Sequence, residues 1–240
     1  MKIKITICYD GTNYNGSQVQ VDCPTIQSKL SEILNILNIN TALAFSGRTD
    51  KGVHAFRQVV SCNIPKFWND LDKLKIALNK LLPKSIQVRN IHKVNCEFHA
   101  RFSAKQREYR FLMTNKKLTP FNANYISYYE NINEKKINDT IKLFLGIHDF
   151  KYFSKKGSDP YTTVREIYNI RFYKHKEIYV LNFQANSYLR SQIRMIVDFI
   201  MKISSGKLTI EELKEQLNTK RLVSWTLAPS HGLYLSKVNY

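Results

Sequence analysis

The middle of the first half of the chain reads Gly47-Arg48-Thr49-Asp50-Lys51-Gly52-Val53-His54-Ala55. Residues 41–46 and 57–64, on either side of this stretch, have the composition of strands. Glycines near both of its ends let the backbone turn sharply and approach a ligand closely. The sequence therefore predicts two strands joined by a tight loop that carries the carboxylate of Asp50.

Outward from this loop, the first half shows a complete α/β unit. Residues 2–8 alternate apolar and polar side chains, as a strand with one buried face does. An apolar stripe that follows Pro24 predicts a helix, and a second stripe over 70–82 predicts another, ended by Pro83. Residues 86–94 return to a strand. The order is β-α-β-β-α-β, the split ferredoxin-like arrangement.

The second half repeats this order in topology, without a residue-level repeat. We expect an α+β fold of two tandem β-α-β-β-α-β (ferredoxin/RRM-like) halves, residues 1–104 with the catalytic loop and residues 105–240 completing a central cleft. The halves would form an extended mixed, mainly antiparallel sheet with helices on one face. The elements expected in the second half are strand 107–113, helix 134–145, strands 162–173 and 177–185, helix 188–203, a short helix 210–217 and strand 233–240.

The charge of the chain indicates a polyanionic partner. Lys and Arg number 37 against 19 Asp and Glu, a formal net charge of +18 over 240 residues. Basic residues are interleaved with aromatic ones, as in Arg101-Phe102 and Arg171-Phe172-Tyr173-Lys174, which suits unpaired RNA or DNA. A solubilising Lys-rich surface is the alternative. We find no basic amphipathic helix suited to a membrane surface.

The cysteines and the N-terminus indicate a reducing compartment. None of the four cysteines forms a C-x-x-C pair or has a histidine at zinc-binding spacing, so free thiols are expected. The first residues alternate as a strand does and lack the apolar run of a signal peptide. The apolar stretch 193–203 is interrupted by Asp198 and Lys202, so no membrane span is expected. The expected location is the cytoplasm or an organellar matrix.

Asp50 is the candidate catalytic residue. Arg48, two positions before it, offers a fixed positive charge that favours the ionised carboxylate, the form required of a nucleophile. A phosphate-binding loop is excluded because Val53-His54 replace the required Lys and Ser/Thr. Residues 10–16 suggest a calcium loop only superficially, since Tyr14 occupies a ligand position. By itself Asp50-Lys51-Gly52 would be an ordinary turn.

Five further blocks extend the pattern of the Asp50 loop along the chain. They are Tyr9-Asp10-Gly11-x-x-Tyr14-x-Gly16, Phe98-His99-Ala100-Arg101-Phe102-Ser103-Ala104 with Arg107-x-Tyr109-Arg110, Gly146-x-His148-Asp149-Phe150-x-x-Phe153, Ala185-Asn186-Ser187-Tyr188-Leu189-x-x-x-Ile193-Arg194, and Ala228-Pro229-x-x-Gly232-Leu233-Tyr234-Leu235. With Gly47-Arg48-Thr49-Asp50-x-Gly52-Val53-His54, these blocks make nearly the whole chain resemble the TruA-type tRNA pseudouridine synthases.

The resemblance implies a reaction and a catalytic residue. Pseudouridine formation breaks the uridine N–C1′ bond, rotates the base and rejoins it through C5, with no metal and no cofactor. The resemblance assigns the catalytic role to Asp50, while attack on the base, attack on C1′ and a glycal route all stay open. The target uridine must leave the stack, which favours loop uridines and a pocket with an aromatic wall.

The resemblance also implies supporting residues. Tyr109 matches the active-site tyrosine, which suits stacking on the base and removal of the C5 proton. Arg194 matches an arginine that pairs with the catalytic aspartate, and Arg48 would open the anticodon stem-loop. Lys51 and Arg110 would contact the substrate, Lys51 in place of a small residue.

Each supporting residue has a plainer explanation. Tyr109 alternates with Phe111 and could be core, and Arg194 stands four residues before Asp198, the spacing of a surface ion pair. His54 is expected to brace its loop. After Gly16 the family usually has tryptophan, where this chain has Ser17. We expect that position to lie in the opening turn, away from the chemistry.

Two hypotheses follow from the sequence. The first is an isomerase that converts uridine to pseudouridine at positions 38 to 40 of the tRNA anticodon stem-loop. The second is a non-catalytic tRNA- or RNA-binding or RNA-folding protein on the same sheet platform, which the combination of Asp50, Tyr109 and Arg194 disfavours. The resemblance further implies a homodimer, with tRNA as the partner.

Overall fold

The computed structural model describes residues 1–155, 157 and 160–240. They divide into two compact units: residues 1–105 with 234–240, and residues 106–233. The predicted division into 1–104 and 105–240 stays a prediction about domains. The compact units differ from it in the place of the last strand, which is grouped with the N-terminal residues.

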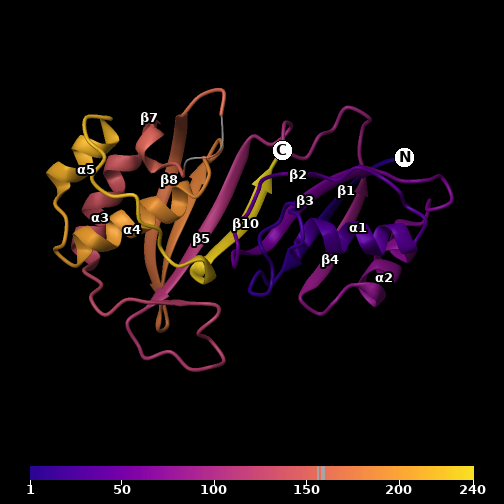
Figure 1. Cartoon of the computed structure of the whole chain (residues 1–240), viewed down its shortest axis with the longest axis horizontal. Helices are drawn as coiled ribbons and strands as arrows, with labels where there is room; N and C mark the ends of the chain where they lie inside the picture. The colour runs from indigo at the N-terminus through magenta and orange to yellow at the C-terminus, as the bar shows by residue number, and fades with distance from the viewer. Residues whose placement is uncertain (156, 158–159) are drawn as a thin grey trace. The chain divides into compact units, whose positions relative to one another are not determined.

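The first unit is a sheet with two helices (Figure 1). Its strands lie in the order β4-β1-β3-β10, and β2 pairs with β3. The pairs β1–β3, β1–β4 and β2–β3 are antiparallel, whereas β10 runs parallel to β3. The elements are β1 Lys2–Tyr9, α1 Ile26–Ile36, β2 Ala44–Phe45, β3 His54–Asn63, α2 Leu71–Leu81, β4 Ile86–Lys93 and β10 Leu233–Asn239.

Alternation in β1 explains why this sheet forms. Ile3, Ile5 and Ile7 are fully buried, and the residues between them are partly exposed, so one face of the strand meets the core. The hydroxyl of Thr25 caps α1 by accepting the N–H of Ser28 at 3.1 Å. Asp70 caps α2 in the same way, accepting the N–H groups of residues 72 and 73. The apolar stripes of both helices are thereby fixed on the buried side.

The second unit has a sheet in the order β5-β9-β8-β7, with β6 parallel to β5. Figure 1 draws α3, α4 and α5 together on one side of β5 and β8. Short 3-10 helices cover 142–144, 151–153 and 230–232. The longer elements are β5 Gln106–Thr114, β6 Ser127–Tyr128, α3 Glu134–Ile141, β7 Gly146–Asp149, β8 Val164–His175, β9 Ile178–Ala185, α4 Gln192–Ser204 and α5 Ile210–Leu217.

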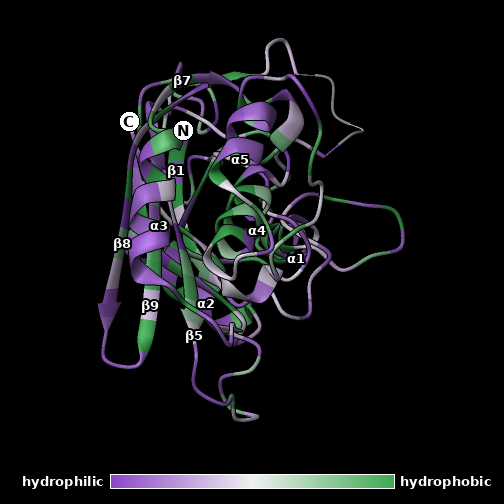
Figure 2. Ribbon diagram, turned by 90° about the vertical axis from the view of Figure 1, so that its left-hand side faces the viewer, coloured by the Kyte–Doolittle hydropathy of each residue, from purple (hydrophilic) through white to green (hydrophobic). Residues whose placement is uncertain are grey.

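Helix α4 is the central element of the second unit. Ten of its 13 residues are buried, and Figure 2 colours it largely hydrophobic while α3 is largely hydrophilic. The helix begins at Gln192, later than predicted, because Ser191 adopts a left-handed φ of 59°. The side chain of Gln192 accepts the N–H of Leu189 at 2.7 Å, which fixes the turn before the helix.

The predicted α+β class and the mainly antiparallel pairing are confirmed. Strand β10 differs from the prediction in one respect, since it pairs with β3 in the first unit. There the ring of Tyr234 stacks on His54 and Phe56, with centroid distances of 4.7 Å in both pairs. The predicted central cleft stays a prediction.

Candidate active site

Asp50 lies in the loop between β2 and β3, as the sequence predicts. Its side chain is partly exposed, Thr49 before it is buried, and Arg48 and Lys51 on either side are exposed. The carbonyl of Asp50 accepts the N–H of Val53 at 3.1 Å, which closes a tight turn. Gly52 completes the turn with a φ of 75° that only glycine adopts readily. The carboxylate is thus carried on a short, internally bonded loop.

A second loop, residues 10–17, packs against the Asp50 loop. The N–H of Gly52 donates to the carbonyl of Tyr14 at 3.3 Å. Gly16 has a φ of 96°, and a Cβ placed on it would lie 2.6 Å from the carbonyl oxygen of Thr49. A Cβ on Gly11 would overlap the carbonyl of Val53. Glycines therefore allow the two backbones to approach closely.

Thr49 is the residue that joins the two loops. Its N–H donates to Oγ of Ser17 at 2.9 Å, and its carbonyl accepts the N–H of Ser17 at 3.1 Å. Its hydroxyl shares a hydrogen bond of 2.8 Å with the hydroxyl of Tyr9. Burial raises the pKa of Tyr9 to about 12, opposed by its hydrogen bonds to Thr49 and Gln58.

Ser17 therefore lies beside the residue that precedes Asp50. The expectation that this position is away from the chemistry is wrong. Although Ser17 belongs to the opening turn, the packing of the two loops brings it to the Asp50 loop, where its side chain is 1% exposed. No pattern within the sequence predicts the contact between Ser17 and Thr49, which lie 32 positions apart. The only sequence signal was its place next to Gly16 in the opening block.

His54 braces the loops, as predicted. Its Nδ1 accepts the N–H of Gly11 at 3.0 Å and lies 3.2 Å from a carboxylate oxygen of Asp10. The ring also stacks on Tyr234, with a centroid distance of 4.7 Å. Because the ring is 2% exposed, it acts as part of the core beneath the Asp50 turn.

Tyr109 lies in the second unit, on the buried face of β5. It is 6% exposed and meets Tyr188 edge to face, with a centroid distance of 5.4 Å. Burial, followed by the charges of Tyr109 and Glu108, raises the pKa of Tyr188. Arg107, two residues earlier on the strand, donates to the carbonyl of Asn186 at 2.9 Å. The central block and the block of residues 185–194 are therefore in direct contact.

Arg110 points to the other face of β5. Its Nη2 lies 3.4 Å from Oε1 of Glu108, and its side chain is 41% exposed. Glu108 also accepts from the side-chain amide of Gln184 at 3.2 Å. Because Arg110 alternates with Tyr109, these two of the three predicted substrate contacts lie on opposite faces of this strand.

Arg194 lies in the first turn of α4. Its Nε donates to the carbonyl of Ala228 at 2.7 Å, and the N–H of Ala228 donates back to the carbonyl of Arg194 at 3.0 Å. Asp198, the predicted alternative partner, forms an ion pair of 2.9 Å with Lys202 and accepts the hydroxyl of Thr226. One side-chain and one backbone hydrogen bond therefore connect the block that contains Arg194 with the block that contains Ala228.

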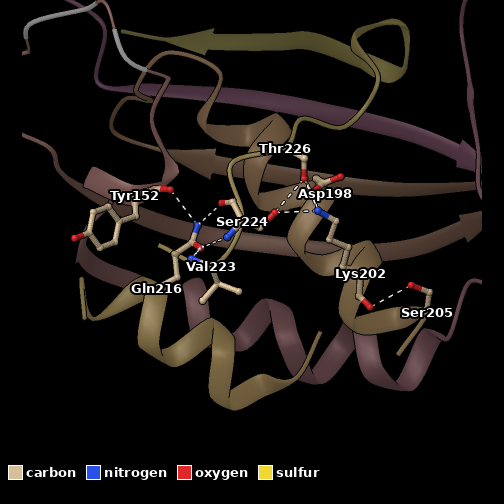
Figure 3. Close-up of polar contacts among 8 residues, drawn as sticks. All are labelled: Tyr152, Asp198, Lys202, Ser205, Gln216, Val223, Ser224 and Thr226. Atoms are coloured by element: carbon tan, nitrogen blue, oxygen red, sulfur yellow. Dashed lines mark hydrogen bonds and ion pairs between the residues drawn. The ribbon is translucent and has the colours of Figure 1, made fainter. Parts of the chain in front are cut away.

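The segment that leads to Ala228 is clamped by side chains from α4 and α5 (Figure 3). Gln216, fully buried, accepts the N–H groups of Val223 and Ser224, both at 2.8 Å. Its amide donates to the carbonyls of Tyr152 and Ser224 at 3.0 and 2.9 Å. Lys202 donates to the hydroxyl of Ser224 at 2.9 Å. Sequence reasoning missed Gln216, because a buried glutamine resembles any polar helix residue.

The structure places the predicted residues in two groups. Asp50, Arg48 and Lys51 belong to the first unit, and Tyr109, Arg110 and Arg194 belong to the second. Over residues 1–155, 157 and 160–240, no group of three or more His, Cys, Asp or Glu side chains is arranged to hold a metal ion. Within the same residues, no helix is long and apolar enough to cross a membrane.

Comparison with known proteins decides the family. The family model described as tRNA pseudouridine synthase matches residues 5–103 and 140–240. The chain belongs to this family. Curated relatives named tRNA pseudouridine synthase A include one from Campylobacter jejuni strain RM1221, 40% identical over the full length of both chains. Another, from Wolinella succinogenes, is 39% identical over 97% of this chain and 92% of its own.

A third curated relative carries the same name. The tRNA pseudouridine synthase A of Phytoplasma mali is 37% identical over 99% of this chain and 98% of its own. A solved structure titled as a Cbf5-Nop10-Gar1 complex covers 81% of this chain and 44% of its own, at 15% identity and a TM-score of 0.36. That likeness is too weak to carry an argument. As a member of the TruA-type tRNA pseudouridine synthases, the chain is an isomerase.

Proposed function

We propose that this synthase isomerises uridine to pseudouridine in the anticodon stem-loop of tRNA, at positions 38 to 40, with Asp50 as the nucleophile. The observation that supports this most is the Asp50 loop: a partly exposed carboxylate held between a buried Thr49 and an exposed Lys51. A carboxylate anchored through its backbone keeps its position while it reacts. Relatives of the same length carry the name tRNA pseudouridine synthase A.

The reaction requires little beyond this carboxylate. The N1–C1′ bond breaks, N1 of the freed base ends protonated, a C5–C1′ bond forms, and the proton of C5 leaves. Tyr109 is suited to stack on the base and to take part in the removal of that proton. Arg194, whose Nε donates to the carbonyl of Ala228, is proposed to pair with the Asp50 carboxylate. We assign these two roles from the resemblance.

Three basic residues are proposed to contact the tRNA. Arg48 and Lys51 flank Asp50 and are exposed, so their charges are available to phosphates or to a displaced base. Arg48 is the proposed agent that opens the stem-loop and holds it open. Arg110, 41% exposed, is the third. We further propose that the protein is a homodimer and that it acts on tRNA in the cytoplasm or an organellar matrix. Sedimentation of the purified chain tests the oligomeric state.

The experiment that tests this function is a map of pseudouridine in unmodified tRNA after incubation with the protein. Mass tagging of pseudouridine is expected to label positions 38 to 40 when they are uridines, and to label nothing after incubation with Asp50→Asn. Labels confined to another arm of the tRNA contradict the position. Tight tRNA binding with no label supports the non-catalytic RNA-binding alternative instead.

A further inference from the structure

Ser17 is held in place from the helix side of its own loop. The carbonyl of Ser17 accepts the N–H of Gln27 at 3.0 Å, and the carbonyl of Gly16 accepts the N–H of Ile26 at 3.2 Å. Both donors lie in the first turn of α1, where N–H groups have no partner within the helix. The turn at residues 16–17 is therefore fixed to the N-terminal end of a packed helix.

From that position Ser17 fixes two consecutive peptide groups. The Thr49 N–H, in the peptide that joins residues 48 and 49, donates to Oγ of Ser17 at 2.9 Å. The Thr49 carbonyl, in the peptide that joins residues 49 and 50, accepts the N–H of Ser17 at 3.1 Å. The second peptide contains the N–H of Asp50 itself. One serine thus sets the orientation of the backbone that enters the catalytic residue.

The other contacts described for Thr49 do not hold its two peptide groups. The Tyr9 hydroxyl holds the Thr49 side chain, with a hydrogen bond of 2.8 Å, but does not reach its peptide groups. The glycine at 16 lets the two backbones meet, since a Cβ there would lie 2.6 Å from the Thr49 carbonyl. Only the Ser17 hydroxyl offers a buried acceptor to the Thr49 N–H among the hydrogen bonds described for that group.

We propose that Ser17 is a positioning residue for the isomerisation: its hydroxyl and N–H hold the peptides on both sides of Thr49, and so orient the carboxylate of Asp50. The proposal rests on the proposed function of Asp50. A misplacement of about 1 Å in a reacting group costs on the order of 100-fold in rate, so the loss of this clamp affects the chemical step. tRNA affinity is expected to fall much less than the rate, because basic residues outside the Asp50 loop also contact the tRNA in the proposed function.

The matched control is Ser61, in β3 of the same unit. Ser61 is also 1% exposed, and its Oγ also accepts a backbone N–H, that of Ala100, at 3.0 Å. It lies seven positions along the strand from His54, roughly 23 Å of extended chain. Ser17→Ala and Ser61→Ala therefore remove the same group from the same kind of site, near Asp50 in one variant and far from it in the other.

The test is single-turnover tritium release from tRNA labelled at C5 of uridine, with tRNA affinity and urea unfolding measured on each variant. Ser17→Ala is expected to lower the release rate at saturating tRNA about 10- to 100-fold, with a much smaller change in tRNA affinity. Ser61→Ala is expected to keep the wild-type rate, and Ser17→Thr to recover most of the loss. A folded Ser17→Ala with the wild-type rate overturns the proposal, as does a Ser17→Thr as slow as Ser17→Ala.

A second measurement does not depend on the folding of a variant. In the wild-type protein the Thr49 amide proton is expected to exchange with solvent far more slowly than that of exposed Lys51, because a buried hydroxyl accepts it. Equal, fast exchange of both overturns the clamp. A wild-type protein that releases no tritium refutes the proposed function instead, and the exchange measurement then still reports on the clamp by itself.

Discussion

At the scale of single residues, Tyr9 connects the Asp50 loop to the pH dependence of folding. Its ordinary pKa of 10.0 rises to about 12 in the folded protein, because burial disfavours the phenolate. Between these values the unfolded chain loses a proton that the folded chain keeps, so the free energy of unfolding falls as pH rises through this interval. Cys62, whose pKa burial raises from 9.0 to about 12, acts in the same direction.

We therefore expect the free energy of unfolding of Tyr9→Phe to fall less than that of the wild type between about pH 10 and 12, because one of the groups that titrate there is absent. Urea unfolding below, within and above the interval measures this. Tyr161, fully exposed, supplies the control, and Tyr161→Phe should reproduce the wild-type slope. A Tyr9→Phe slope equal to the wild type would contradict the buried, neutral phenol.

Glycine 16 offers a test of the close approach between the two loops. Gly16→Ala meets two penalties, a φ of 96° and a Cβ 2.6 Å from the Thr49 carbonyl oxygen. Gly146→Ala meets only the first, since its φ is 90° and no atom lies within 4 Å of the added Cβ. Both changes are expected to cost about 1–2 kcal/mol for the left-handed backbone.

Gly16→Ala should cost further stability and should also lower the rate of tritium release, because the clash displaces Thr49. Gly146→Ala should keep the wild-type rate. Unfolding curves and release rates of the two variants, measured side by side, decide the point. Equal stabilities and equal rates would show that the loops are not packed as described.

At the scale of secondary-structure elements, the buried hydrogen bonds between Gln216 of α5 and residues 223–224 contribute most clearly to stability. Gln216→Leu leaves the N–H groups of Val223 and Ser224 without the amide oxygen that accepts them at 2.8 Å. Unsatisfied buried groups of this kind cost about 1–3 kcal/mol each, so we expect a loss of about 3 kcal/mol or more. Urea unfolding measures it.

The neighbouring Glu215 is the control for this helix. It pairs with Arg221 at 2.8 Å on the surface, and exposed pairs contribute about 0–1 kcal/mol. Glu215→Gln should therefore unfold close to the wild type. If Gln216→Leu does the same, the segment that leads to Ala228 and Arg194 is not held by the glutamine.

The sequence predicts elements well where periodicity is strong. Alternation located β1 and β5, and apolar stripes located α1 and α2, because burial of one face determines both pattern and structure. The two-residue strand β6 and the four-residue β7 are too short to show a period. Helix α4 starts late because Ser191 turns left-handed, a local conformation that composition does not reveal.

Contacts between distant residues were the part of the site that the sequence could not supply. Motif spacing identified the Asp50 loop, since chemistry restricts which residues can stand there. The neighbours that hold it were hidden: Ser17 is a small polar residue in a turn, and only folding shows that it is buried against Thr49. For the same reason the contact between Arg194 and Ala228 appears only in the structure.

At the scale of the whole molecule, the net charge of +18 predicts how tRNA binding responds to salt. A protein that neutralises about six phosphates loses roughly 1000-fold in affinity between about 50 and 200 mM salt. We expect a steep linear fall of log affinity with log salt, measured by filter binding. Asp50→Asn should give the same slope, because the Asp50 carboxylate neutralises no phosphate and its removal leaves the number of phosphate contacts unchanged. A shallow slope would contradict a binding surface dominated by phosphate contacts.

The central claim, that Asp50 carries the isomerisation, is tested most directly by tritium release from tRNA labelled at C5 of uridine. Asp50→Asn is compared with Asp22→Asn, the same chemical change at an exposed residue whose φ of 55° asparagine tolerates. Wild type and Asp22→Asn should release tritium at equal rates, and Asp50→Asn should release none while it still binds tRNA. Release by Asp50→Asn at the wild-type rate would contradict the claim.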